Sequence, residues 1–172
     1  GAEISRNDFN ARFNDEGSEC MLNGLFMIGD EQLFDAHTMI DHAKPHCNSH
    51  EHYKGILQDK SKGVFNGKVM VRQDAQKTNA FQQNNTILLS DDAVMNTKPQ
   101  LEIFADDVKC SHGATIGKLN DEAKFYLKSR GIGEDAATAI LIHAFASDVI
   151  TSIKIPALRD YLEEIITKRF NQ

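Results

Sequence analysis

Short apolar runs separated by polar turn segments fill the first two thirds of the chain. The runs recur about every 12 to 18 residues and are Cys20–Leu22, Leu25–Ile28, Ile56–Leu57, Val69–Val71, Ile87–Leu89 and Leu101–Phe104. The segments between them are rich in Gly, Asn, Asp and Ser, and they include Asn14–Gly17, Asp59–Gly63, Gln83–Asn85 and Ser90–Asp92. Strand-length runs bounded by such residues are typical of β-structure. The pattern therefore predicts an all-β region up to about Gly117.

Two all-β architectures fit this spacing. Asn-Gly pairs occur at Asn23–Gly24 and Asn66–Gly67, each just before an apolar run. In a hairpin sandwich such pairs form tight turns between antiparallel strands. In a parallel β-helix they form corners, and each rung stacks on the one before it. The spacing alone leaves both architectures open.

After Gly117 the pattern changes to helical periodicity, and it predicts three short amphipathic helices. Asn120 is a suitable N-cap for the first helix, and Gly131 lies just past its end. The second helix starts near Gly133, and the third begins at Pro156, a residue favoured in the first helical turn. We therefore divide the chain into a β-region, residues 1–117, and a helical domain, residues 118–172. The helices either cap the β-region and cover its strand edge, which the sequence alone favours, or present a surface to a partner.

Composition narrows the functional classes. The 172 residues are 41% hydrophobic and 26% charged, with a net charge of −6. An acidic chain without a basic patch argues against nucleic-acid binding, and no apolar run is long enough to span a membrane. The three cysteines are too few and too scattered for a disulfide framework, which favours a reducing, cytosolic compartment. The chain begins Gly-Ala-Glu, so we expect a longer protein trimmed at its N-terminus.

The only Cys-x-His of the chain lies at the change from strands to helices. In a strand, Cys110 and His112 point to the same face, roughly 7 Å apart along the backbone. A thiolate and an imidazole suit a soft or borderline metal, but two ligands make only half a site. The alternative is structural: His112 forms a hydrogen bond at a strand end, and Cys110 packs as a small hydrophobic residue.

Several segments of the chain resemble a known family. They are collinear from about Asp41 to about Asp148, and they comprise Tyr53–Leu57, Phe65–Val69, Leu88–Ala93, Pro99–Ile103, Ala105–Thr115 and Phe125–Ile132. In these segments the chain resembles the SufB/SufD family of iron–sulfur cluster assembly proteins, and within it the SufD branch. Family members have a longer N-terminal portion, so the chain resembles their C-terminal part.

The resemblance implies a fold and a function. The implied fold is a right-handed parallel β-helix (solenoid) followed by a small helical domain. The implied function is that of a scaffold rather than an enzyme, paired with SufB and docking the SufC ATPase through its C-terminal helices. No cofactor is expected in the isolated chain; a transient iron–sulfur cluster forms at the SufB interface of the complex. The implied location is the cytoplasm, or the plastid stroma in a eukaryote.

The same resemblance places His112 at that interface as a ligand of the nascent cluster or its metal. Cys110 is the weaker candidate for metal or sulfur contact. The ligand set is completed by the partner, since a complete set in one chain would hold the cluster instead of passing it on. We expect no sulfur-accepting cysteine here, because the resemblance assigns that residue to SufB.

Other candidate sites are weaker. Most of the histidines lie between His37 and His52, close to Cys47, but their spacing matches no closed Cys/His metal motif. We interpret them as surface or turn residues, and His143 on the second helix likewise. Asp106 and Asp107 are adjacent, so on a strand their carboxylates point to opposite faces.

Two further functions stay open at this level. One is an acidic β-solenoid enzyme acting on carbohydrates, which requires two carboxylates facing one groove. The other is a purely structural protein in which the solenoid edge pairs with a second copy of the chain to form a homodimer.

Overall fold

The computed structural model describes residues 2–170, which form eight strands and three helices. The strands are β1 (Ile4–Phe13), β2 (Glu19–Ile28), β3 (Leu33–His42), β4 (Asn48–Leu57), β5 (Lys62–Val71), β6 (Asn79–Leu88), β7 (Val94–Ile103) and β8 (Lys109–Gly117). The helices are α1 (Asp121–Ser129), α2 (Glu134–Thr151) and α3 (Pro156–Phe170). The chain divides into two compact units, a β-unit of residues 1–116 and a helical unit of residues 117–172.

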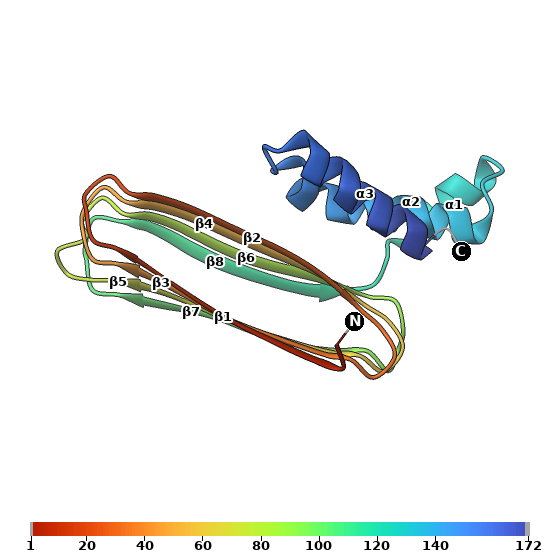
Figure 1. Cartoon of the computed structure of the whole chain (residues 1–172), viewed down its shortest axis with the longest axis horizontal. Coiled ribbons are helices and arrows are strands. Elements are labelled where there is room, and N and C mark those ends of the chain that lie inside the picture. The colour runs from red at the N-terminus through yellow and green to blue at the C-terminus, as the bar shows by residue number, and fades with distance from the viewer. Residues whose placement is uncertain (1, 171–172) are drawn as a thin grey trace. The chain divides into compact units, whose positions relative to one another are not determined.

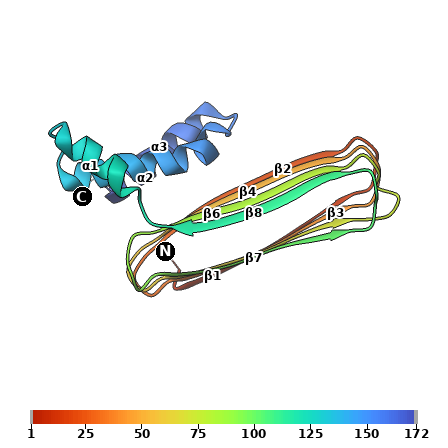
Figure 2. The ribbon, with the colours of Figure 1, turned by 180° about the vertical axis from the view of Figure 1, so that it is seen from behind.

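The β-unit is a parallel β-solenoid. Its strands form two four-stranded sheets, ordered β1-β3-β5-β7 and β2-β4-β6-β8 (Figure 1). Each strand from β1 to β6 pairs in parallel with the strand two places later in the chain, so that Ile4 lies beside Leu33 and Leu33 beside Lys62. Two strands, one in each sheet, make a rung, and Figure 2 shows the same stack of rungs from behind. The predicted β-helix followed by helices is confirmed, and the antiparallel hairpin sandwich is wrong.

Three polar segments that the sequence analysis interpreted as turns or corners lie inside strands instead. Asn23–Gly24 is in the middle of β2, Asn66–Gly67 in the middle of β5, and Gln83–Asn85 in β6. The two glycines serve close packing rather than a turn, since a Cβ at Gly24 would lie only 2.3 Å from Cε1 of Tyr53. The corners are elsewhere, and four of them contain a non-glycine residue with positive φ: Asp30, His46, Asp59 and Lys77.

The interior between the two sheets contains both apolar and polar side chains. One apolar cluster joins Phe26 of β2 with Ala36 and Phe65 from the other sheet. The ring of Phe26 also stacks on Phe34, with 4.2 Å between the ring centroids. Because side chains alternate along a strand, every second residue of each strand enters this interior.

The interior leaves no room for a side chain at Gly55, which provides a test of the packing. An added Cβ would lie 2.5 Å from Cζ of the buried Phe26 and 3.1 Å from Oγ1 of Thr86. We expect Gly55→Ala to reduce the free energy of unfolding by about 1–3 kcal/mol, measured by urea denaturation. The matched control is Gly113→Ala, because a Cβ at Gly113 meets nothing within 4 Å. Equal stability of the two variants would contradict this packing.

The helical unit begins and ends its elements where the sequence predicts. The Asn120 side chain accepts a hydrogen bond from the Ala123 N–H, 2.9 Å, which caps α1. Gly131 follows α1 with φ of 84°, and α3 begins at Pro156. Within this unit α2 packs against both α1 and α3. No helix in residues 2–170 combines the length and the apolar character that crossing a bilayer requires.

Candidate functional site

The side chains of Cys110 and His112 lie on the inner face of β8, the last strand of the solenoid. Cys110 packs against an interior cluster that contains Val69 and Val71. Thr115, an odd number of residues away, faces outward, where its Oγ1 accepts a hydrogen bond from Asn85 Nδ2, 2.8 Å. Because side chains alternate, these two contacts place residue 112 on the same inner face as Cys110.

The register between β6 and β8 follows from a single backbone hydrogen bond. The Lys109 N–H donates to the Thr78 carbonyl, 2.8 Å, just as the Asn79 N–H donates to the Cys47 carbonyl between β4 and β6. In the β4–β6 pair this bond accompanies the pairing of Asn48 with Asn79. Lys109 therefore lies beside Asn79. Counting along the two strands from this pair, Cys110 lies beside Ala80 and His112 beside Gln82, and all four face inward.

The two candidate ligands differ in exposure. Cys110 is half-buried, and burial raises the pKa of its thiol above the ordinary value, which disfavours the thiolate that binds metals. His112 is exposed, and within residues 2–170 its side chain makes no hydrogen bond or ion pair. A neutral imidazole with free nitrogens is a ready ligand, so the geometry favours His112 over Cys110.

The histidines of the segment His37–His52 point in different directions. His37 contacts Asp35 with 2.9 Å between Nε2 and Oδ1, and His52 contacts Asn85 with 3.0 Å between Nε2 and Oδ1. His50 stacks on Phe81, whereas His46 occupies a corner. Across residues 2–170, three or more His, Cys, Asp or Glu side chains never gather closely enough to hold a metal ion. A metal bound at His112 would therefore need ligands from outside the described residues.

His42, which the sequence analysis interpreted as a surface or turn residue, is instead buried inside the solenoid. Its Nε2 lies 2.8 Å from Ser49 Oγ, and its ring meets the Phe13 ring edge-on, with 4.6 Å between centroids. Burial lowers the pKa of His42 from 6.5 to about 4, although the nearby Asp41 carboxylate opposes the shift. The imidazole therefore supports the fold rather than a metal site.

This lowered pKa predicts an acid-dependent loss of stability. The unfolded chain binds a proton at His42 near pH 6.5 and the folded chain only near pH 4, so stability falls as the pH drops through this window. At pH 5 the loss from His42 is about 2 kcal/mol relative to pH 7. Urea unfolding at both pH values should show a smaller loss in His42→Leu than in the unsubstituted chain. Glu51 acts in the opposite direction, because burial raises its pKa, and it is unchanged in the comparison. An identical pH dependence in both chains would contradict this assignment.

The sequence analysis considered Asp106 and Asp107 as strand residues. The structure places both in the corner before β8 instead. The Asp107 carboxylate pairs with Lys77 Nζ. The Asp107 backbone N–H donates to Gln76 Oε1, 2.9 Å. These contacts tie one rung's corner to the next, and they give no sign of a paired-carboxylate centre.

A group of buried polar residues inside the solenoid was missed by the sequence analysis. Glu51 and Gln82 are each 2% exposed and Asn84 is fully buried. Gln82 Nε2 donates to Glu51 Oε2, 2.7 Å, whereas Glu51 Oε1, Gln82 Oε1 and Asn84 Oδ1 have no hydrogen-bond partner. The rung register would have revealed the group, because strand pairing places Glu51 beside Gln82.

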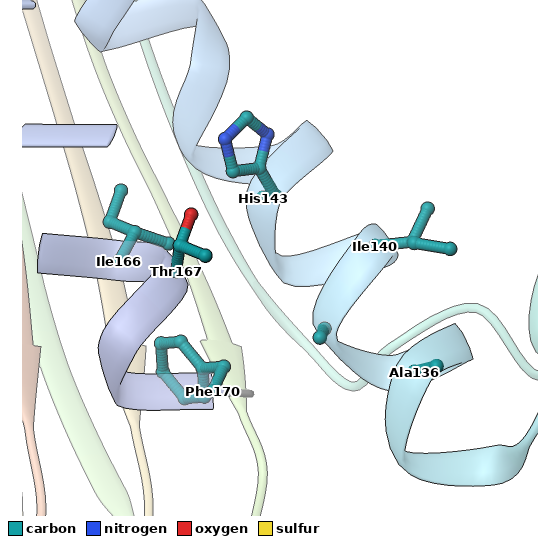
Figure 3. Close-up of a pocket in the computed structure, with 7 residues that line it drawn as sticks. Ala136, Ile140, His143, Ile166, Thr167 and Phe170 are labelled. Atoms are coloured by element: carbon teal, nitrogen blue, oxygen red, sulfur yellow. The ribbon is translucent and has the colours of Figure 1, made fainter. Parts of the chain in front are cut away.

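The helical unit carries a second candidate surface, a groove of about 260 Å³ between α2 and α3 (Figure 3). Its lining is largely apolar and consists of Ala136, Ala139, Ile140, His143, Ile166, Thr167 and Phe170. Ile140 is 45% exposed although it lines the groove. Other large apolar side chains of the unit are exposed as well: Phe125, Tyr126, Ile155, Leu158, Tyr161 and Ile165. Large exposed apolar patches are typical of protein–protein contact sites, so the groove is a candidate docking surface.

The chain is similar in sequence to proteins of iron–sulfur cluster assembly. Residues 1–145 match the family model described as "SUF system FeS cluster assembly, SufBD core domain". The iron–sulfur cluster assembly protein SufD of Escherichia coli is 40% identical over 169 residues, 98% of this chain. A SufBD family protein of Synechocystis is 38% identical over 98% of the chain, and the chloroplastic protein ABCI7 of Arabidopsis thaliana is 37% identical over 93%.

The similarity covers only part of each relative. The aligned region is 40% of the E. coli protein, 37% of the Synechocystis protein and 34% of the Arabidopsis protein. The chain thus spans about two fifths of the length of the curated relatives that it matches.

Proposed function

The chain belongs to the SufBD family of iron–sulfur cluster assembly proteins, and from this premise we propose that it is the SufD-type half of an assembly scaffold. In this proposal SufB is its partner, the SufC ATPase docks on its helical unit, and a nascent cluster is the cargo. The chain itself contributes ligands and surfaces, and ATP hydrolysis belongs to SufC. The proposed location is the cytoplasm or the plastid stroma.

The observation that carries the proposal is the placement of His112. It extends from the inner face of the last strand, and it is exposed and free of partners within residues 2–170. Imidazole nitrogen is a good ligand for iron. A single exposed ligand binds iron or a cluster only when a second protein supplies the rest, which suits cargo that must be handed on. Cys110 is the weaker candidate beside it, because burial raises the pKa of its thiol and so disfavours the thiolate.

The helical unit supports docking of a second protein. Its groove is lined by apolar side chains of α2 and α3, and Ile140 is accessible from solvent. Protein–protein interfaces have an apolar centre with a few anchoring side chains that fill pockets. We assign this surface to SufC.

Co-expression of the chain with SufB and SufC tests the proposal. Affinity purification through a tag on the chain, followed by size-exclusion chromatography with and without ATP, should give a ternary complex whose elution changes with ATP. Recovery of a folded chain without either protein would contradict the scaffold function. Elution of the chain alone as a dimer would favour the homodimer interpretation instead.

A further inference from the structure

We propose that Asn85 is a positioning residue for His112: its hydrogen bond to Thr115 fastens the last strand, β8, to β6 and so holds His112 in one place on the solenoid. The inference rests on the proposed function of His112 and deepens it. It assigns a task to a row of polar side chains on the outer face of the sheet β2-β4-β6-β8.

The row crosses three strands. His52 Nε2 of β4 lies 3.0 Å from Asn85 Oδ1 of β6, and Asn85 Nδ2 donates to Thr115 Oγ1 of β8, 2.8 Å. The Asn85 amide thus uses its oxygen on one side and its nitrogen on the other. Because His52 engages the oxygen, the nitrogen is turned toward Thr115. The register derived above places Asn85 directly beside Thr115, so the hydrogen bond joins a cross-strand pair.

β8 is the strand that most needs such a fastening. It is the last strand of its sheet, with β6 as its neighbour. Gly113 and Gly117 lie within it, and glycine in a strand costs conformational entropy and offers no side chain to pack. Among the outward-facing residues of β8, only Thr115 makes a side-chain hydrogen bond within residues 2–170.

The position of this hydrogen bond connects it to the candidate site. His112 lies midway between Thr115 and Lys109, whose backbone N–H donates to the Thr78 carbonyl, 2.8 Å. The two bonds therefore attach β8 to β6 on both sides of His112. Thr115 is also the last residue but one of the β-unit, so along the chain a movement of the helical unit reaches Thr115 before His112. A ligand that a partner protein must complete has to stay within about 0.5 Å of its place, which a frayed strand does not allow.

Amide hydrogen exchange of the ¹⁵N-labelled 172-residue chain, followed by nuclear magnetic resonance, tests the inference without SufB, SufC or iron. Alternate N–H groups of a parallel strand face its neighbour, so the Ser111 and Gly113 N–H groups, in step with that of Lys109, report local opening of β8. We expect Thr115→Val to speed their exchange about 2–10-fold, because valine keeps the shape of the side chain and lacks the acceptor. Valine also favours strands, so an effect of strand propensity alone would not speed exchange. Thr115→Ser keeps the hydroxyl and should keep the exchange slow.

A second variant removes the donor instead of the acceptor. Asn85→Leu should speed the exchange of the same two amides by a similar factor. The matched control is Gln83→Leu. Gln83 is exposed, lies two residues earlier on the outer face of the same strand and makes no side-chain hydrogen bond within residues 2–170. The control should leave exchange in β8 unchanged, and exchange in the opposite sheet should be the same in all four variants.

Equal exchange of β8 in Thr115→Val and in the unsubstituted chain would overturn the inference. Fast exchange in Thr115→Ser would do so as well, as would an acceleration spread evenly over the solenoid. In cells, Thr115→Val should lower cluster formation and Thr115→Ser should not. Normal cluster formation in Thr115→Val beside a loss in His112→Ala would end the positioning task, whereas normal formation in both would remove the proposed function of His112.

Discussion

A chain carrying His112→Ala is expected to fold normally and to lose about tenfold or more of its cluster-forming activity in cells. The side chain is exposed and makes no hydrogen bond or ion pair within residues 2–170, so its removal should change the free energy of unfolding by no more than about 0.5 kcal/mol. The same side chain is the only accessible imidazole on the inner face of β8. Its loss removes a ligand and leaves the scaffold intact.

The measurement is the activity of an iron–sulfur enzyme in cells that depend on the chain for cluster assembly. Co-purification with SufB and SufC should be unchanged in the same cells, which separates loss of a ligand from loss of a partner. Ser111→Ala is the matched control, because Ser111 is the exposed neighbour on the outer face of the same strand. Normal enzyme activity in His112→Ala would remove His112 from the site, and an equal loss in Ser111→Ala would show that the effect is not specific.

The helical part of the fold was predictable from local signals. Asn120 caps α1, Gly131 ends it and Pro156 starts α3, and each of these depends on the backbone of one or two turns. The strands were harder, because their Asn-Gly pairs resemble turns. The space above Gly24 is occupied by Tyr53 of the neighbouring strand β4, and the space above Gly67 by Gln82 of the opposite sheet. Local sequence cannot reveal contacts between residues that lie this far apart in the chain.

The same limit applies to the candidate site. Strand alternation alone puts Cys110 and His112 on one face. It does not show that burial raises the pKa of the Cys110 thiol, nor that Gln82 lies beside His112, since both depend on the register between β6 and β8. Glu51 was unremarkable in the sequence for this reason: a charged residue in a strand is normally assigned to the outer face. Its inward position follows only from pairing.

Removal of the helical unit is expected to abolish capture of SufC while leaving the β-unit folded. Residues 1–116 form a compact unit with its own interior clusters, so a chain ending at Gly117 should retain its β-rich circular dichroism spectrum. Recovery of SufC with this shortened chain would place the contact on the solenoid.

Single substitutions place that contact more finely. Ile140 lines the groove between α2 and α3 and is 45% exposed, so Ile140→Asp places an unpaired charge where an apolar partner side chain would be buried. We expect SufC affinity to fall about 30-fold or more, the effect of losing an anchoring residue of about 2 kcal/mol, measured by titration calorimetry. Ile155→Asp is the matched control. Ile155 is 61% exposed, lies in the segment that connects α2 to α3 and does not line the groove. Since both variants add the same charge to an exposed isoleucine, a difference between them reports on the groove alone. Equal affinities would exclude the groove as the docking site and leave the other exposed apolar residues of α1 and α3 to be tested.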